Sequence, residues 1–298
     1  MKPAAFSYHA PDSVDTAVAT LAQHADDAKV IAGGQSLVPI LAMRMSAFGH
    51  LVDIGRIDSL TGIDRTAEGL SIGAMTTQAT VQRSADVAAV APLLARATAF
   101  IGHFQIRNRG TIGGSLAHAD PAAEYPAVAR TLGAELELTG PNGSRRVAAD
   151  DFFLGTWMTA AEPDEILTAV HFPAWQGKTG FAVREFARRH GDFALAGVTC
   201  GVQVEGDTIG RLAIGLFGVG STPERASAAE QAATGASVDD LDLDDLAATA
   251  VVDLDPAADL HAGAEHRKRI ATALVREAVS AAVDEARQGS QREGANNV

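Results

Sequence analysis

Two short glycine segments contain the residue types that bind phosphate. The first is Ala32-Gly33-Gly34-Gln35-Ser36-Leu37, which follows the apolar pair Val30-Ile31, and the second is Thr111-Ile112-Gly113-Gly114-Ser115. Residues without a Cβ let backbone N–H groups approach an anion closely, and the hydroxyls of these segments add further donors. Two such segments, about 80 residues apart, suit a ligand with two phosphates, because each phosphate needs several donors. A dinucleotide is therefore the first candidate, and a pair of tight turns is the alternative.

Three other chemistries fit these segments less well. The Gly-x-Gly-x-x-Gly fingerprint of an ordinary Rossmann domain is absent from both. Gly113 to Ala117 resembles a hydrolase nucleophile elbow, but no apolar strand precedes it and His118 is too close in sequence to act as the base. One histidine and two carboxylates, His118, Asp120 and Glu124, do not make the complete nitrogen and sulfur ligand set of a closed zinc site. We therefore expect neither a metal nor a catalytic residue in this chain.

Composition limits the partners and the redox chemistry. A formal net charge of −13 argues against nucleic acid or an anionic membrane as the main partner, so membrane association is at most peripheral. The single cysteine, Cys200, cannot hold an iron–sulfur cluster and lies in an apolar stretch typical of a buried strand. Any redox centre in this chain must therefore be organic. The N-terminus lacks a signal-peptide pattern, and we expect a cytoplasmic protein.

The periodicity of apolar residues predicts the elements that position these segments. A helix over 14–24, a strand over 29–32, a helical turn over 37–45 and a strand over 51–54 form a small βαβ-like unit. Strands at 70–74 and 134–138 then indicate antiparallel sheet, interrupted by helices over 76–99 and 122–132. After a boundary at 173–178, strands over 180–186, 194–204 and 211–219 precede helices that include 264–287. The acidic run 239–245 predicts a loop and a helix start.

Three motifs together resemble those of the FAD-carrying medium subunit of molybdenum hydroxylases, the family of carbon monoxide dehydrogenase and xanthine dehydrogenase. They are the two glycine segments and a third segment, Arg188-Arg189-His190-Gly191-Asp192-Phe193-Ala194. The resemblance extends from Pro3 to about Arg287. It implies an α+β fold: a two-subdomain FAD-binding domain of the PCMH type (VAO-like), with subdomains 1–55 and 56–176, and a C-terminal domain of antiparallel sheet and helices, 177–287. The polar composition of 288–298 predicts a disordered tail.

The resemblance also implies where FAD lies, extended between the first two subdomains with its pyrophosphate held by backbone of both glycine segments. Glu124 matches an acidic residue near the adenosine ribose, although Asp is more usual there. Ile101 matches a side chain that covers adenine, and Phe193 stands where the carbon monoxide dehydrogenase branch has a tyrosine against the flavin ring. Arg184 and Leu167 are weaker matches beside the cofactor. The full expected set is Ala32, Gly33, Gly34, Gln35, Ser36, Leu37, Ile101, Thr111, Gly113, Gly114, Ser115, His118, Glu124, Leu167, Arg184 and Phe193.

The function implied is that of an electron-transfer subunit. A large partner would hold the molybdenum-pterin cofactor and oxidise the substrate, and a small partner would hold two iron–sulfur clusters, in a complex expected to be a dimer of heterotrimers. This chain would pass electrons through FAD to an external acceptor. A stand-alone flavin oxidoreductase and an assembly subunit without FAD are the alternatives. The substrate and the acceptor are left open.

Overall fold

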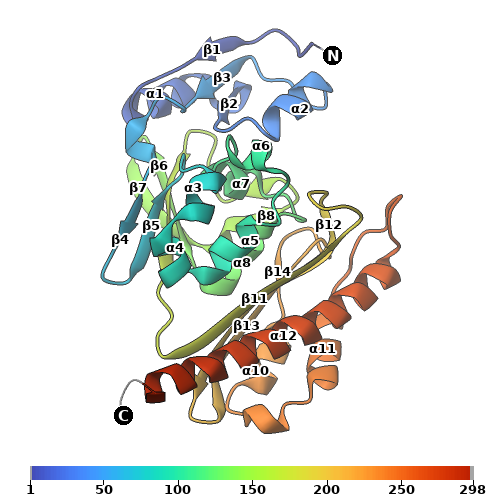
Figure 1. Cartoon of the computed structure of the whole chain (residues 1–298). Coiled ribbons are helices and arrows are strands. Elements are labelled where there is room, and N and C mark those ends of the chain that lie inside the picture. Colours follow the sequence, from blue (N-terminus) through green and yellow to red (C-terminus); the bar gives the residue numbers. More distant parts are fainter. Residues whose placement is uncertain (1, 296–298) are drawn as a thin grey trace.

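The computed structural model describes the backbone of residues 2–295 and the side chains as far as residue 288. The chain forms three lobes, one above another, in the order of the sequence (Figure 1). Among the described residues, no helix is both long and apolar enough to cross a membrane. The two glycine segments belong to different lobes, so the contact between the first and middle lobes decides whether the segments can act together.

The first lobe is a parallel sheet with one covering helix. Its strands are β1 (Ser7–His9), β3 (His50–Asp53) and β2 (Ala28–Ile31), in that order across the sheet. Helix α1 (Val14–His24) begins where the Ser13 hydroxyl accepts from the Thr16 N–H, and it buries Ala17, Val18 and Leu21. The short 3₁₀ helix η1 (Ala25–Asp27) leads into β2, and α2 (Leu37–Ala42) follows the first glycine segment. The predicted βαβ-like unit is confirmed.

The middle lobe is a five-stranded antiparallel sheet with helices against it (Figure 1). Its strand order is β4 (Ile63–Arg65), β5 (Gly69–Gly73), β10 (Ile166–Pro173), β6 (Glu135–Gly140) and β7 (Gly143–Ala148). The remaining elements are η2 (Asp58–Leu60), α6 (Phe104–Arg107), α7 (Ile112–His118), α8 (Glu124–Leu132), α9 (Ala149–Phe152) and the small pair β8 (Phe153–Gly155) and β9 (Met158–Thr159).

The single helix predicted over 76–99 is wrong. Three short helices, α3 (Gln78–Arg83), α4 (Ala85–Val90) and α5 (Pro92–Thr98), occupy this stretch. Ser84 is extended, and its hydroxyl accepts from the Val87 N–H to begin α4. Pro92 has no N–H to donate back into α4, and it begins α5 instead. The predicted helix over 122–132 begins two residues late, at Glu124.

The third lobe places a long helix across an antiparallel sheet of β11 (Lys178–Ala187), β12 (Ala194–Glu205), β13 (Thr208–Phe217) and β14 (Glu224–Arg225). Helices α10 (Ser227–Ala233) and α11 (Leu243–Val251) and the 3₁₀ helix η3 (Val238–Asp240) complete it. The acidic run behaves as predicted, because the Asp242 carboxylate accepts from the Asp244 and Asp245 N–H groups, both at 3.0 Å, at the start of α11. Cys200 is fully buried on β12, as expected of a core residue.

Helix α12 (Ala264–Ala295) runs farther than the sequence analysis predicts. Disorder is expected from residue 288, but the helix continues to Ala295, and residues 296–298 lie outside the described part of the chain. Gln, Arg, Glu and Ala residues in this stretch have good helix propensity, and elongating a formed helix is far easier than nucleating one.

Strand β11 joins the middle and third lobes through its two faces. Phe181 and Val183 belong to the core of the middle lobe, whereas Ala182 belongs to the core formed with α12. Successive side chains of a strand point to opposite faces, so odd-numbered residues of β11 face the middle lobe. Arg96 of α5 strengthens this junction, since its two terminal nitrogens each lie 2.6 Å from a carboxylate oxygen of Glu285 on α12.

Candidate cofactor site

The two glycine segments meet backbone to backbone. A Cβ added to Gly33 would lie 2.1 Å from the carbonyl oxygen of Arg109 and 2.9 Å from the Cα of Gly110. A Cβ added to Gly114 would lie 3.3 Å from the Cβ of Ala32. Glycine is therefore required at residue 33 by the neighbouring backbone itself, because no side chain fits in that space. The structure brings together the two segments that the sequence analysis paired.

The first segment offers a row of uncommitted donors. Within the described residues, the N–H groups of Gly33, Gly34, Gln35 and Ser36 donate no hydrogen bond, and the Ser36 hydroxyl makes none. Gly34 has a φ of +71°, which turns the chain so that successive N–H groups converge. The Gln35 side chain holds the turn by donating from Nε2 to the Gly33 carbonyl at 2.9 Å. This arrangement is the concave donor set that a diphosphate requires.

The second segment differs from this expectation, because its N–H groups are already used. Ile112 and Gly113 donate to the carbonyls of Thr76 and Ala74, at 3.0 and 2.9 Å. Gly114 donates to Thr111 Oγ1 at 3.0 Å, and Ser115 donates to the Thr111 carbonyl at 3.1 Å. These residues open α7, and Thr111 is its N-cap, which explains where their donors go. The segment can therefore offer hydroxyl groups and a side-chain-free surface rather than backbone N–H groups.

Two acidic side chains lie near each other where the middle lobe meets β11. Burial, together with the charge of nearby Glu185, raises the pKa of Glu124, the first residue of α8, to about 8. Burial also raises the pKa of Glu185, on β11, to about 7. The Glu185 Oε2 atom is buried and has no hydrogen-bond partner among the described residues. Such a pair can hold a proton near neutral pH and exchange hydrogen bonds with the hydroxyls of a bound ligand.

Glu185 was missed by the sequence analysis, which selected its neighbour Arg184. Arg184 lies on the opposite face of β11, and its Nε is 3.8 Å from Glu277 Oε2 on α12. The structure therefore does not bring Arg184 to the acidic pair. The missed signal is the strand alternation itself, because apolar Phe181 and Val183 mark the face on which residue 185 must also lie. Leu167 is buried in the core of the middle lobe.

Ile101 and Phe193 lie on two loops that touch. The Ile101 side chain is 9% exposed, and Arg107 fixes its loop by donating from Nη1 to the carbonyls of Ile101 and Gly102, at 2.8 and 3.0 Å. The loop between β11 and β12 packs on it, since a Cβ added to Gly191 would lie 3.1 Å from the carbonyl carbon of Gly102. Phe193, at the end of that loop, is 66% exposed and offers a free aromatic face.

His118 lies at the end of α7, in a small polar cluster. Its Nε2 is 4.0 Å from Asp120 Oδ2, and its ring stacks on Trp157 with the centroids 6.0 Å apart. Burial lowers the pKa of His118, an effect that the Asp120 carboxylate opposes. Asp120 also accepts from Trp157 Nε1 at 3.4 Å. The predicted His118 is thus a half-buried imidazole held between an acid and an indole.

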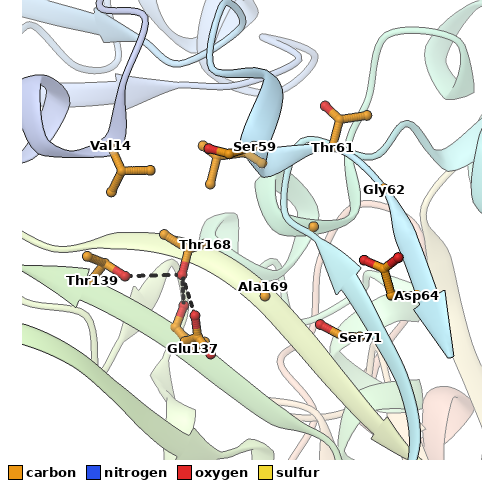
Figure 2. Close-up of a pocket in the computed structure, with 12 residues that line it drawn as sticks. Val14, Ser59, Thr61, Gly62, Asp64, Ser71, Glu137, Thr139, Thr168 and Ala169 are labelled. Carbon is orange, nitrogen blue, oxygen red and sulfur yellow. Dashed lines mark hydrogen bonds between the residues drawn. The ribbon is translucent and has the colours of Figure 1, made fainter. Parts of the chain in front are cut away.

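A separate cavity of about 280 Å³ lies between the first lobe and the five-stranded sheet (Figure 2). None of the residues that line it belongs to the predicted set. Its polar side chains bond one another: Thr168 Oγ1 lies 3.2 Å from Thr139 Oγ1 and donates to the Glu137 carbonyl at 3.2 Å. Because no residue of either glycine segment lines this cavity, it is distinct from the candidate cofactor site.

Comparisons with known proteins agree with this geometry. The family model described as the FAD binding domain in molybdopterin dehydrogenase matches residues 4–175, and the CO dehydrogenase flavoprotein C-terminal domain matches residues 181–282. The chain is 39% identical to the carbon monoxide dehydrogenase medium chain of Hydrogenophaga pseudoflava, over 95% of this chain and 98% of that one. It is also 39% identical to subunit alpha of the 6-hydroxypseudooxynicotine dehydrogenase complex of Paenarthrobacter nicotinovorans, over 96% and 97%.

A solved structure has the same fold. The solved structure of carbon monoxide dehydrogenase from Hydrogenophaga pseudoflava that lacks the Mo-pyranopterin moiety of its molybdenum cofactor contains a chain that superposes on this one with a TM-score of 0.94 and 41% identity. The superposition covers 96% of this chain and 99% of that one. The predicted fold class, a two-subdomain FAD-binding domain followed by a sheet-and-helix domain, is confirmed.

Proposed function

Because the chain belongs to the family of FAD-binding medium subunits of molybdenum hydroxylases, we propose that segment 33–36 holds the FAD diphosphate and that a partner's iron–sulfur clusters supply the electrons. The chain is the FAD-carrying electron-transfer subunit of such a hydroxylase, and electrons leave it for an external acceptor. We further propose that the complex is a dimer of heterotrimers in the cytoplasm.

The observation that carries the proposal is the run of four N–H groups from Gly33 to Ser36 that donate no hydrogen bond within the described residues. This run packs against Arg109 and Gly110 of the middle lobe. Phosphate oxygens satisfy such a row without any nearby cation, which suits a chain of net charge −13. Bound FAD supplies both one-electron and two-electron chemistry. The residues of this chain bind it and orient it: Glu124 and Glu185 toward ribose hydroxyls, Ile101 toward adenine, and Phe193 toward the ring system.

Substrate choice belongs to another subunit in this proposal. The two relatives reported above are equally similar to this chain, yet one is named for carbon monoxide and the other for 6-hydroxypseudooxynicotine. The degree of sequence identity between medium subunits therefore does not indicate which substrate the complex oxidises.

The composition of the native complex tests this function. The chain is purified from its native source by an antibody, and bound flavin, molybdenum, iron and co-purifying polypeptides are quantified. We expect FAD in a one-to-one ratio with the chain, together with a molybdenum-containing large subunit and an iron-containing small subunit. A flavin-loaded chain without partners would indicate a stand-alone oxidoreductase, and a complex without flavin would indicate an assembly subunit. Either result contradicts the proposal.

A further inference from the structure

Three histidines gather at one end of the first lobe. His9 ends β1, His24 ends α1 and His50 begins β3. One ring nitrogen of each lies within 4.8 Å of the ring nitrogens of the other two, and all three residues are half-buried. The three come from separate elements, so the fold of the lobe, rather than a local turn, brings them together.

One pair in this trio has a spacing close to that of two ligands on one metal ion. His9 Nε2 and His50 Nδ1 are 3.0 Å apart. Two nitrogens bound to one tetrahedral Zn²⁺ at about 2.0–2.1 Å stand about 3.3 Å from each other. The third ring, that of His24, stacks on His50 with centroids 3.5 Å apart and an interplanar angle of 13°. Because ring-nitrogen lone pairs lie in the ring plane, the His24 ring must turn out of this stack for all three nitrogens to converge on one ion, and the half-buried position of the three side chains leaves room for that rotation.

Hydrogen bonds among the three rings do not explain why all three histidines lie together. The contact between His9 and His50 satisfies one ring nitrogen of each, whereas His24 makes no side-chain hydrogen bond among the described residues. No carboxylate belongs to this group among the described residues, and the carboxylate of Asp27 is engaged elsewhere, because its Oδ1 accepts from the N–H of Gly49, next to His50, at 2.8 Å. An imidazole set without a carboxylate is typical of sites for zinc, copper or nickel rather than for magnesium or calcium.

The trio is separate from the cofactor site. In the parallel pairing of β2 with β3, Ala28 lies opposite His50 and Ile31 lies opposite Asp53. His50 is therefore at the amino end of β3, and His9, which pairs with Val52, is on the edge strand β1, whereas segment 33–36 follows the carboxyl end of β2, the other edge strand. An ion there would tie β1, an edge strand of three residues, to the end of α1.

We propose that His9, His24 and His50 bind one divalent transition metal of the Zn²⁺ class, with water completing a tetrahedral shell. This inference does not depend on the proposed electron-transfer function. The test uses the untagged full chain, loaded with FAD, dialysed first against Zn²⁺ and then against metal-free buffer. We expect one retained zinc per chain, and Co²⁺ in place of Zn²⁺ should give the intense visible bands of tetrahedral coordination.

Variants locate the ion. His24→Gln should weaken zinc binding by more than the about 10- to 100-fold that loss of an outer-shell partner costs, while flavin content stays unchanged. His266→Ala, which removes an exposed histidine in the third lobe, is the matched control and should bind as the unchanged chain does. Should His24→Gln fail to fold, the cobalt spectrum of the unchanged chain still decides. Absence of retained zinc, octahedral cobalt bands, or full zinc affinity in a folded His24→Gln chain would overturn the proposal.

Discussion

Gly33 of the first lobe packs so closely on Arg109 of the middle lobe that a Cβ at residue 33 would lie 2.1 Å from the Arg109 carbonyl oxygen. Real Cβ atoms do not approach a carbonyl oxygen to that distance, so the contact fixes how the two lobes meet. The same residue begins the row of uncommitted N–H groups. The packing of the lobes and the proposed phosphate site therefore share one residue.

Gly33→Ala should separate the two glycine segments and weaken FAD binding by at least about 10-fold, which is about 1.4 kcal/mol. The reason is displacement of the donor row, since a Cβ clashes with backbone that cannot rotate away. Isothermal titration of the flavin-free chain with FAD measures the loss. Gly263→Ala is the control, because a Cβ there meets nothing within 4 Å. Equal FAD affinity in Gly33→Ala and the unchanged chain would refute the role of this segment.

The stability of the flavin-free chain should depend on pH through Glu124 and Glu185. Their pKa values in the folded chain, about 8 and about 7, lie above the usual 4.5 because burial disfavours the charged forms. Between about pH 5 and about pH 8 the folded chain holds protons that the unfolded chain releases, so these groups lower the free energy of unfolding as pH rises.

Glu185→Gln removes one ionisation and the charge that raises the pKa of Glu124, and it should flatten this decline. Urea unfolding at several pH values, compared between the variant and the unchanged chain, isolates the effect from other titrating groups. Glu68→Gln changes an exposed carboxyl and serves as the control. An identical pH dependence in Glu185→Gln and the unchanged chain would show that the acidic pair has no such linkage.

Phe193→Ala should leave FAD affinity nearly unchanged while shifting the flavin potential or slowing its reoxidation. Phe193 is 66% exposed, and its proposed contact with FAD is ring stacking, without a hydrogen bond to phosphate. Aromatic stacking adds only about 0.5–1.5 kcal/mol beyond the buried area. Redox titration and stopped-flow reoxidation are the measurements, with the fully exposed Leu260→Ala as control. If neither quantity changes, Phe193 does not contact the flavin.

Much of the fold follows from local patterns, and the site follows only in part. Helix α1 and strand β6 are visible in the periodicity of apolar residues, whereas the three helices α3 to α5 depend on Ser84 and Pro92, and only the structure shows that these residues begin new helices. The glycine segments are visible in sequence, but the commitment of the second segment's N–H groups to Thr76, Ala74 and Thr111 is a tertiary property. To choose between Arg184 and Glu185, one must know which residues of β11 point to the middle lobe. Neighbouring residues of a strand point to opposite faces of the sheet, so an error of one residue selects the wrong face.

Electron entry from a partner is the central claim, and it can be measured without knowing the substrate. The small iron–sulfur subunit of the native complex is purified, reduced in the absence of oxygen, freed of excess reductant and mixed rapidly with this FAD-loaded chain. We predict bleaching of the flavin absorption together with recolouring of the clusters, followed by return of the flavin colour when an electron acceptor is added. A flavin that stays oxidised beside the reduced clusters of its own partner, although dithionite bleaches it, would contradict the account.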